Sequence, residues 1–325
     1  MMIGSLISIS SYSWFSMWMG LEINLLSIIP LMSTTKNPLS SESALKYFIT
    51  QAMASSILLF TIIIIMSKSE FTSHKFNEFL MMLINSTFLI KMGAAPFHFW
   101  FPEIIEGLSW MNCLIIMTWQ KIAPFILLNY TMSPSLFLNI IIICSTMIGG
   151  IMGLNQTSLR KILAFSSINH MSWMLSSMLC SISTWLIYFT IYSLITMNII
   201  FMFMKTNAFH ISQFFNSTNK SKMTKMFMMM NFLSLGGLPP FLGFFPKWVM
   251  INFMVENKFY FTSLIMIMIT LITLFFYLRL TFNTMTMNNI ETLNKSIHQN
   301  KFSLILFNSV NIMGLLICTI VFNFI

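Results

Sequence analysis

A succession of long apolar segments constrains this chain more than any other feature of its sequence. A helix needs about 20 apolar residues to cross a hydrocarbon core about 30 Å thick. The segments that meet this requirement are 14–32, 44–66, 77–108, 110–129, 134–154, 158–180, 182–205, 224–256, 259–281 and 302–323. Residues 1–13 are also apolar, but they are too few for a full crossing. We therefore predict an all-α polytopic membrane protein with ten full transmembrane helices and a short or truncated first helix.

The small number of charged residues is also typical of a membrane protein, and their distribution over the loops predicts its orientation in the membrane. Only 8% of the residues are charged, whereas a soluble domain carries about a quarter. When the loops are assigned alternately to the two sides, eleven of the 17 Lys and Arg residues fall on one side and three on the other. Basic loops stay on the cytoplasmic or matrix side, so we expect the C-terminus on the opposite side. The net charge of +9 thus reflects topology, and we expect no nucleic-acid partner.

The cysteines give no indication of a cofactor. Cys113, Cys144, Cys180 and Cys318 lie inside apolar runs and show no CxxC spacing, which is typical of packing residues. The sequence also lacks the motifs that bind dinucleotides, nucleoside phosphates, haem or iron–sulfur clusters. We therefore expect no cofactor and no metal in this chain.

Two segments are too long for one straight helix and carry Gly and Pro near their centres. They read KMGAAPFHFWFPE over 91–103 and GGLPPFLGFFPK over 236–247. At an offset of 144 residues, the matching positions are Gly93 with Gly237, Pro96-Phe97 with Pro240-Phe241, and Pro102 with Pro246. Helix-breaking residues recur in membrane helices, but several matches at one spacing indicate an internal repeat.

The broken segment is the third of five spans in each half of the chain. The halves are 14–154 and 155–325, and they follow the short segment 1–13. Because five is odd, the second half must enter the membrane from the opposite face, as in the inverted repeats of secondary transporters. Broken helices are tolerated only inside protein or beside a water-filled cavity. The sequence therefore predicts two inverted five-helix repeats, each with a half-channel.

Four charged residues fall at mid-membrane depth, far from the ends of their spans. They are Glu22 within MGLEINLLSIIP, Lys91 before the first break, Lys121 within TWQKIAP, and Lys247 after the second break. A charge at the bilayer centre costs about 2.5–3.5 kcal/mol on insertion scales. Snorkelling to the membrane surface relieves this cost only where a helix end is within reach. We therefore take these residues as candidates for a proton relay.

Lysine suits a proton relay better than arginine, which stays charged in proteins. A low-dielectric interior makes an ammonium group release its proton more readily, and a nearby carboxylate opposes that release. An ion pair between Glu22 and Lys91 would hold the proton on the lysine, and separation of the pair would pass the proton towards Lys121. All three residues fall in the same half of the chain.

Further candidates are histidines and glutamates close to these positions. His170 lies mid-span in SSINHMSWM, and His98 lies just past the first break. A histidine in a membrane carries protons near neutral pH, or it only hydrogen-bonds a neighbouring helix. Glu103 and Glu106 lie at the basic end of their span, as interfacial residues or as a proton entrance.

Six stretches, spread in order along most of the chain, match a known pattern. They are WMGLEINLLSIIPLM (18–32), SALKYFITQA (43–52), KMGAAPFHFWFPEI (91–104), TWQKIAP (118–124), LRKILAFSSINHMSWM (159–174) and GGLPPFLGFFPKW (236–248). Together they resemble the chain 2 family of NADH:ubiquinone oxidoreductase, the antiporter-like proton-pumping subunits of respiratory complex I. The broken-helix motif alone would not separate this family from chains 4 and 5 or from multisubunit cation/proton antiporters.

The resemblance implies roles for the candidate residues. Glu22 and Lys91 match the ion pair of the family, and Lys121 matches its central relay. His170 matches a relay position between the repeats, and Lys247 matches the lysine near the exit half-channel. The chain follows the animal mitochondrial pattern, which lacks three further N-terminal helices of the bacterial one.

The resemblance also implies a location and partners. We expect a multi-pass protein of the mitochondrial inner membrane whose partners are protons, membrane lipids and other complex I membrane subunits, including neighbouring antiporter-like chains. FMN and iron–sulfur clusters are expected in other subunits of the complex. The basic loops should then lie on the matrix side, and the C-terminus on the intermembrane-space side.

We therefore expect a proton-translocating subunit of NADH:ubiquinone reductase that performs no redox chemistry itself. Moving one charge against 100 mV costs about 2.3 kcal/mol, so the energy must come from redox reactions elsewhere in the complex. Two alternatives stay open. The chain could be a cation/proton antiporter that uses the same lysines, which would be active alone in vesicles. It could also be a structural subunit whose buried charges only fix helix packing.

Overall fold

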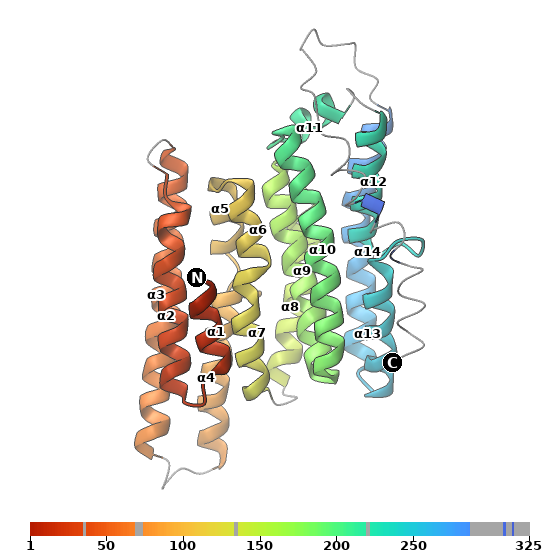
Figure 1. Cartoon of the computed structure of the whole chain (residues 1–325). Helices are drawn as coiled ribbons and strands as arrows, with labels where there is room; N and C mark the ends of the chain where they lie inside the picture. Colours follow the sequence, from red (N-terminus) through yellow and green to blue (C-terminus); the bar gives the residue numbers. More distant parts are fainter. Residues whose placement is uncertain are drawn as a thin grey trace. The chain divides into compact units, whose positions relative to one another are not determined.

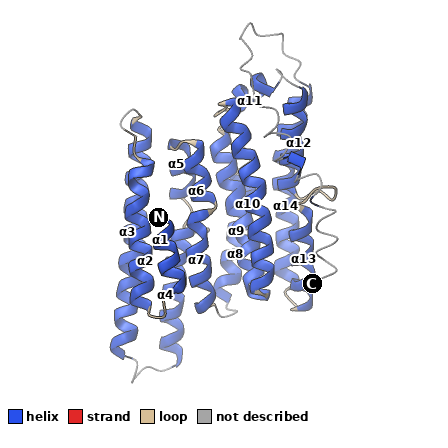
Figure 2. Cartoon of the chain, in the orientation of Figure 1, coloured by secondary structure: helices blue, strands red, loops and turns tan. Residues whose placement is uncertain are grey.

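The chain is predominantly helical in the computed structural model, which describes residues 1–34, 37–68, 74–132, 136–218, 222–286, 308, 309 and 314 (Figure 2). Within these ranges the helices are α1 (Met2–Ser10), α2 (Trp14–Met32), α3 (Pro38–Lys68), α4 (His74–Met92), α5 (Trp100–Gly107), α6 (Trp110–Met117), α7 (Trp119–Thr131), α8 (Leu136–Met152), α9 (Leu159–Cys180), α10 (Ile182–Thr206), α11 (Ile211–Thr218), α12 (Lys222–Gly236), α13 (Phe244–Glu256) and α14 (Tyr260–Thr286). The expected span 302–323 lies outside the described residues, apart from 308, 309 and 314.

Several of these segments are long and apolar enough to cross a membrane. Among the described residues they are Trp14–Met32, Pro38–Ser67, Trp110–Thr131, Ile182–Thr206 and Tyr260–Thr286. Helix α8 is apolar but shorter, and α9 has the length of a span with a more polar sequence. The prediction of an all-helical, multi-pass membrane protein is thus confirmed, and the count of ten full spans stays a prediction.

Two compact units divide the chain, Met1–Cys144 and Ser145–Ile325, and the division falls within α8. In the first unit α3 packs against both α2 and α4, and α7 packs against α4 (Figure 1). Helix α1 lies close against α2, because a Cβ atom at Gly20 would be only 2.6 Å from the backbone nitrogen of Ser8. With nine residues, α1 is about 14 Å long at 1.5 Å per residue. A helix of this length is shorter than the hydrocarbon core of a bilayer.

In the second unit α9 is buried along most of its length and contacts α10, α13 and α14. Its many serines bond to carbonyls of the preceding turn. For example, the Ser166 hydroxyl donates to the Leu163 carbonyl at 2.8 Å, and the Ser176 hydroxyl donates to the Trp173 carbonyl at 2.8 Å. Such bonds satisfy the hydroxyl donor within the helix itself. A polar helix can therefore be buried among apolar neighbours.

Helices α4 and α12 both end in a left-handed glycine. Gly93 has a φ of +78° and Gly237 has a φ of +76°, a conformation that glycine adopts without the steric penalty of a Cβ atom. The next helices, α5 and α13, begin at Trp100 and Phe244. Both predicted breaks are therefore present, and the segments that connect the two helices at each break are equally long.

The hydrogen bonds at the two helix ends also correspond. At the first end Gly93 N donates to Ile90 O at 3.1 Å, and Ala94 N donates to Leu89 O at 3.1 Å. The equivalent bonds at the second end, 144 residues later, measure 3.0 and 3.3 Å. This pair of bonds is the Schellman motif, which satisfies carbonyls of the last helical turn. Carbonyls nearer the break still need other donors.

A further interruption, which the sequence did not predict, separates α6 from α7. It lies at Thr118, whose backbone φ and ψ are −117° and −72°. The Thr118 hydroxyl donates to Leu114 O at 2.7 Å, a bond from side chain to backbone that often bends helices. The segment 110–129, expected to be a continuous helix, is therefore interrupted three residues before Lys121.

Candidate functional site

Lys91 lies in the last turn of α4, directly before the first break, and its residue is only 8% exposed. Its backbone carbonyl accepts a hydrogen bond at 3.4 Å from Nε2 of Gln51, a residue of α3. That bond supplies a donor to a carbonyl at the end of the helix, which has no partner within α4. The Lys91 ammonium group is therefore not needed to cap its own helix.

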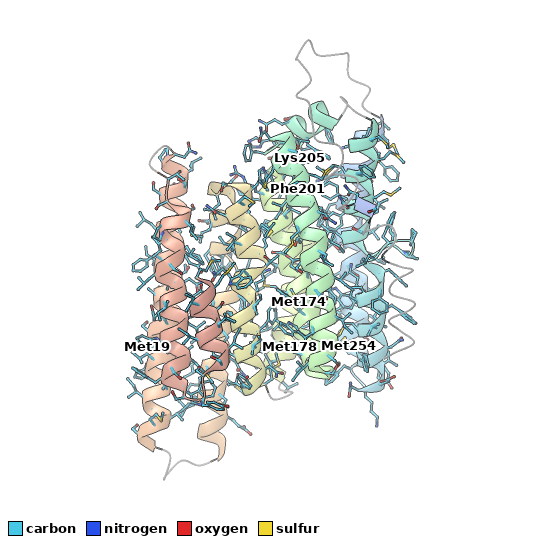
Figure 3. The ribbon with its side chains drawn as sticks, in the orientation of Figure 1. Met19, Met174, Met178, Phe201, Lys205 and Met254 are labelled. Atoms are coloured by element: carbon cyan, nitrogen blue, oxygen red, sulfur yellow. The ribbon has the colours of Figure 1, made fainter. Side chains whose placement is uncertain are left out.

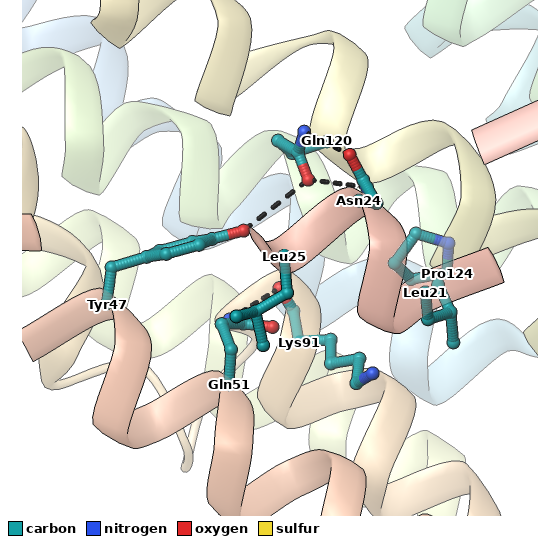
Figure 4. A pocket seen from close by; sticks show the side chains of 8 residues that line it. All are labelled: Leu21, Asn24, Leu25, Tyr47, Gln51, Lys91, Gln120 and Pro124. Atoms are coloured by element: carbon teal, nitrogen blue, oxygen red, sulfur yellow. Dashed lines mark hydrogen bonds between the residues drawn. The ribbon is translucent and has the colours of Figure 1, made fainter. Parts of the chain in front are cut away.

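Beside Lys91 lies a small cavity that is lined by polar and apolar side chains from four helices of the first unit (Figure 4). Its volume is about 20 Å³. The lining residues are Leu21, Asn24 and Leu25 of α2, Tyr47 and Gln51 of α3, Lys91 of α4, and Gln120 and Pro124 of α7. A cavity of about 10–15 Å³ is enough for one water molecule when polar partners line it.

An amide pair forms one side of this cavity. Asn24 Nδ2 donates to Gln120 Oε1 at 2.9 Å, and Gln120 Nε2 donates to Asn24 Oδ1 at 3.1 Å. The Tyr47 hydroxyl donates to the same Gln120 oxygen at 3.4 Å. All three side chains are buried, so their hydrogen bonds are shielded from competing solvent. The pair thus joins α2 to α7 and links both helices to α3.

Lys121 lies in the first turn of α7 and is only 1% exposed. Its Nζ atom lies 5.1 Å from the ring centroid of Phe101, which belongs to α5, the helix after the first break. An ammonium group at this distance from an aromatic face is stabilised by the ring quadrupole. The structure therefore buries Lys121 next to an element of the break and next in sequence to Gln120.

Glu22 differs from the lysines, because its residue is only half-buried in α2. It acts electrostatically on Lys91, but the two side chains form no ion pair within 4 Å. The two side chains are therefore not in direct contact in this conformation, and the expected ion pair stays a prediction. Opposite charges still attract beyond contact distance when little water lies between them. In this conformation Glu22 and Lys91 interact at longer range.

Glu103 has a direct partner at the surface of the first unit. Its Oε2 atom lies 2.9 Å from Nζ of Lys46, which also pairs with Glu42 at 3.0 Å. The side chains of this cluster are 42–58% exposed, and ion pairs with this exposure contribute about 0–1 kcal/mol to stability. Glu106 lies one turn further along α5 and is half-buried. An interfacial position and a proton entrance both remain compatible with these two glutamates.

His98 lies within the first break and is buried. Its Nδ1 atom lies 3.3 Å from the Pro96 carbonyl oxygen, and its ring centroid lies 4.4 Å from that of Phe99. The imidazole therefore bonds to the backbone of its own loop. This contact fits the structural interpretation of His98, and its relay role stays a prediction.

His170 lies in the middle of α9 and is buried against α10. Its Nδ1 atom lies 2.9 Å from the Tyr188 hydroxyl, and its ring centroid lies 5.0 Å from that of Tyr192. A hydrogen bond at one ring nitrogen fixes the orientation of the imidazole. The relay role of His170 stays a prediction.

The bond from Tyr188 to His170 makes a testable contribution. Replacing Tyr188 with phenylalanine keeps the ring and removes the hydroxyl, so a buried imidazole nitrogen loses its partner. We expect a loss of about 1–3 kcal/mol in stability, measured as a lower midpoint temperature for thermal denaturation of the assembled complex. Tyr130→Phe is the matched control, because Tyr130 is 57% exposed. Equal denaturation of the two variants would contradict the assigned bond.

Lys247 lies in the first turn of α13, directly after the second break, and is 9% exposed. Its Nζ atom donates to Gly236 O at 2.9 Å and to Leu235 O at 3.4 Å. These carbonyls end α12, where the helix dipole is negative and favours a cation. The carbonyl 144 residues before Leu235 belongs to Lys91 and accepts from the neutral Gln51 amide. The two breaks therefore use different donors at the same position.

Lys205, near the end of α10, is a lysine with which the three deeply buried lysines can be compared. Lys205 is in the last turn of α10, and its Nζ atom lies 4.5 Å from the ring centroid of Phe201, one turn earlier (Figure 3). Its residue is half-buried. A cation in the last turn is favoured by the helix dipole and can reach solvent. Lys91, Lys121 and Lys247 are all more deeply buried.

The predicted residues group by unit. Glu22, Lys91 and Lys121 belong to the first unit, and His170 and Lys247 belong to the second.

Four polar residues that contact the candidate site were not predicted from the sequence, namely Asn24, Tyr47, Gln120 and Tyr188. A signal was present for the two amides, because an Asn or Gln inside an apolar span usually bonds to another helix. Their pairing across 96 positions of sequence is visible only in the structure.

Metal ligands do not cluster in the described ranges. Residues 1–34, 37–68, 74–132, 136–218, 222–286, 308, 309 and 314 contain no group of three or more His, Cys, Asp or Glu side chains placed to hold an ion. Three cysteines within these ranges, Cys113, Cys144 and Cys180, form no disulfide bond, and Cys318 lies outside them.

Comparison with known proteins places the chain among membrane subunits. The family described as "NADH:quinone oxidoreductase/Mrp antiporter, TM" matches residues 11–273. The chain is 50% identical to NADH-ubiquinone oxidoreductase chain 2 of Anopheles gambiae and 51% identical to that of Aedes aegypti, in each case over 98% of this chain and 95% of the relative. The chain belongs to the NADH-ubiquinone oxidoreductase chain 2 family. The chain 2 protein of Locusta migratoria is 47% identical over 98% of this chain and 94% of its own length.

Solved structures share the fold of this chain 2 family member. A chain of respiratory complex I from Thermus thermophilus with bound aureothin matches with a TM-score of 0.83 and 20% identity, over 96% of this chain and 75% of that chain. A chain of the Mrp complex from Dietzia sp. DQ12-45-1b matches with a TM-score of 0.72 and 15% identity, over 85% and 57%. At these identities the likeness shows a common antiporter-like fold.

Proposed function

We propose that the chain translocates protons in mitochondrial complex I along buried side chains that cross the membrane midplane laterally. The complex oxidises NADH and reduces ubiquinone elsewhere, and this subunit of the H⁺-translocating reductase uses the energy released. The side chains of the path are Glu22, Lys91, Lys121, His170 and Lys247, and His98 is a further proposed relay residue.

The observation that carries this proposal is the position of the buried lysines. Lys91 precedes the first break, Lys121 follows the interruption at Thr118, and Lys247 follows the second break. An interrupted helix leaves backbone carbonyls and amides that can hydrogen-bond to water beside each lysine. Buried cations that merely stabilised packing would be expensive at these depths. Their recurrence at interrupted helices favours proton transfer over a structural role.

The proposed architecture consists of two inverted repeats, 14–154 and 155–325, after the short segment 1–13. The matching glycine conformations and Schellman bonds at the two breaks support it, because they recur at the 144-residue offset found in the sequence. Each repeat then contributes five of ten spans and one half-channel. Five spans in each half place the second repeat upside down relative to the first.

The order of proton transfer follows from the chemistry of each residue. The Glu22 carboxylate holds the proton on Lys91 while the two charges are close, and a conformational change that weakens this attraction releases the proton towards Lys121. His170, bonded to Tyr188, passes protons between the repeats, and Lys247 delivers them to the exit half-channel. In this scheme the pump is driven by changes in distance between charged groups.

The location and partners follow from the family. The subunit is proposed to lie in the mitochondrial inner membrane, with its basic loops on the matrix side and its C-terminus on the intermembrane-space side. It contacts lipids and other membrane subunits of complex I, including antiporter-like chains. FMN and the iron–sulfur clusters are held by other subunits.

A single neutralising substitution tests the function. Glu22→Gln keeps the size of the side chain and removes the charge that acts on Lys91. We expect normal assembly and a fall in NADH-driven proton pumping of about tenfold, since one order of magnitude corresponds to ~1.4 kcal/mol of interaction. Pumping is measured by dye quenching in proteoliposomes that contain the whole complex.

The control is Glu42→Gln, which neutralises an exposed glutamate of α3. Lys46 keeps its second partner, Glu103, so we expect full pumping from this variant. Full pumping from assembled Glu22→Gln complex as well would contradict the relay. Cation-dependent transport by the isolated chain in vesicles would instead favour an antiporter.

A further inference from the structure

The cavity beside Lys91 has a feature that the proposed relay does not use. Its polar lining includes the Asn24–Gln120 amide pair and the Tyr47 hydroxyl, none of which ionises at physiological pH. Amides hold fixed donors and acceptors over the whole physiological pH range. Such groups cannot carry a proton themselves, but they can orient a molecule that does.

We propose that Asn24, Tyr47 and Gln120 are positioning residues that hold one water molecule against the Lys91 ammonium group, and that this water receives the proton that Lys91 sends towards Lys121. The inference rests on the proposed function and deepens it. It assigns the cavity to water and gives Gln120, the neighbour of Lys121 in sequence, a defined role.

The size and lining of the cavity fit this occupant. A volume of about 20 Å³ is sufficient for one water molecule and too small for an organic ligand. A buried water makes about three hydrogen bonds. The side chains of Lys91, Gln51 and Gln120 all line the cavity and supply such partners.

Pro124 adds another acceptor near the cavity. Proline has no N–H group, so the carbonyl four residues earlier, that of Gln120, receives no bond from it within α7. Pro124 and Gln120 both line the cavity. The proline therefore leaves the Gln120 carbonyl without its usual helical donor, in the turn of α7 that also holds Lys121.

The bonds of the amide pair explain why its orientation is fixed. Each amide both donates to and accepts from the other, and the Tyr47 hydroxyl donates to Gln120 Oε1. Reversal of either amide would place two donors or two acceptors face to face. The two amides at the cavity therefore keep their donors and acceptors in the same places in each pumping cycle, as positioning of a water requires.

Two substitutions in the whole complex test this inference. Gln120→Met keeps the length of the side chain but removes its donor and acceptor, and we expect pumping to fall about tenfold, the effect of one ordinary hydrogen bond. Leu25→Phe leaves every polar group in place and fills the cavity, so we expect a comparable fall. If the Gln120→Met complex does not assemble, proton pumping by the Leu25→Phe complex tests the proposed water site by itself.

The matched control is Thr131→Val. Thr131 of α7 bonds to Asn85 of α4, a buried polar pair that joins the same two helices as Gln120 and Lys91 but does not line the cavity. We expect unchanged pumping from this variant. An equal fall in Thr131→Val and Gln120→Met would show that helix packing alone is measured, and it would overturn the positioning role.

Direct density for the water separates this inference from the relay itself. In a cryo-electron microscopy map that resolves waters, we expect one peak between Lys91 and Gln120 in the native complex and none in Leu25→Phe. No peak in the native complex, with Lys91→Met still unable to pump, would overturn the water site and leave the proposed function standing. Full pumping in Lys91→Met and Gln120→Met would overturn both.

Discussion

Replacement of Lys121 with methionine is expected to leave the complex assembled and to reduce NADH-driven proton pumping about a hundredfold, the lower range for loss of a proton-transfer group. Lys121 is 1% exposed, and methionine fills a similar volume. Removal of the cation also relieves an insertion cost of about 2.5–3.5 kcal/mol. Stability should therefore be retained while the proton carrier is lost.

The control for this experiment is Lys205→Met. Both lysines lie near a phenylalanine ring, at 5.1 Å for Lys121 and 4.5 Å for Lys205, but Lys205 lies in the last turn of its helix. We expect full pumping from Lys205→Met. Assembly would be followed by native electrophoresis, and pumping would be measured in proteoliposomes. If assembled Lys121→Met complex pumps at the native rate, the buried lysine is structural and the relay is refuted.

The breaks in α4 and α12 could be predicted from sequence because their causes are local. Gly93 and Gly237 adopt positive φ angles, and the prolines after them cannot donate a backbone hydrogen bond. Spacing in the sequence was enough to align the two. The interruption at Thr118 has no such signal, since threonine occurs widely in membrane helices and bends them only when its hydroxyl bonds to the backbone.

Contacts between distant residues could not be predicted in the same way. Burial of the lysines followed from their position in apolar spans, and the structure agrees. The distance between Glu22 and Lys91 depends on how α2 is rotated about its axis against its neighbours. Because apolar residues lie on several faces of α2, the sequence does not determine this rotation. The Asn24–Gln120 pair depends on the same rotation. Both therefore required the packed structure.

Lys247 caps the end of α12, a role that its position in the sequence did not indicate. Its depth identified it as a candidate, but the structure adds that its ammonium group bonds to two carbonyls at the end of α12. Movement of α12 relative to α13 would break these bonds and change the environment of the cation. The break between α12 and α13 thus connects the conformation of the second unit with the environment of this cation, provided that the two helices keep their close approach.

That close approach gives the prediction with the largest effect on stability. Gly243 precedes α13, and a Cβ atom there would overlap the backbone carbonyl oxygen of Ser234 in α12. Its φ of −66° suits any residue, so contact alone demands glycine. Because backbone atoms cannot move aside as a flexible side chain can, we expect Gly243→Ala to cost about 4 kcal/mol or more. Such a loss would prevent accumulation of the assembled complex.

Gly236→Ala is the matched control, at the other end of the same break. A Cβ atom at Gly236 would meet side chains only, with Tyr277 Cδ2 at 3.6 Å and Leu274 Cγ at 3.7 Å, both ordinary contact distances. We expect this variant to accumulate like the native complex on native gels, while Gly243→Ala does not. Equal accumulation of the two would mean that α12 and α13 do not approach each other backbone to backbone. In that case the bonds from Lys247 to the end of α12 could not be maintained either, because they depend on the same spacing.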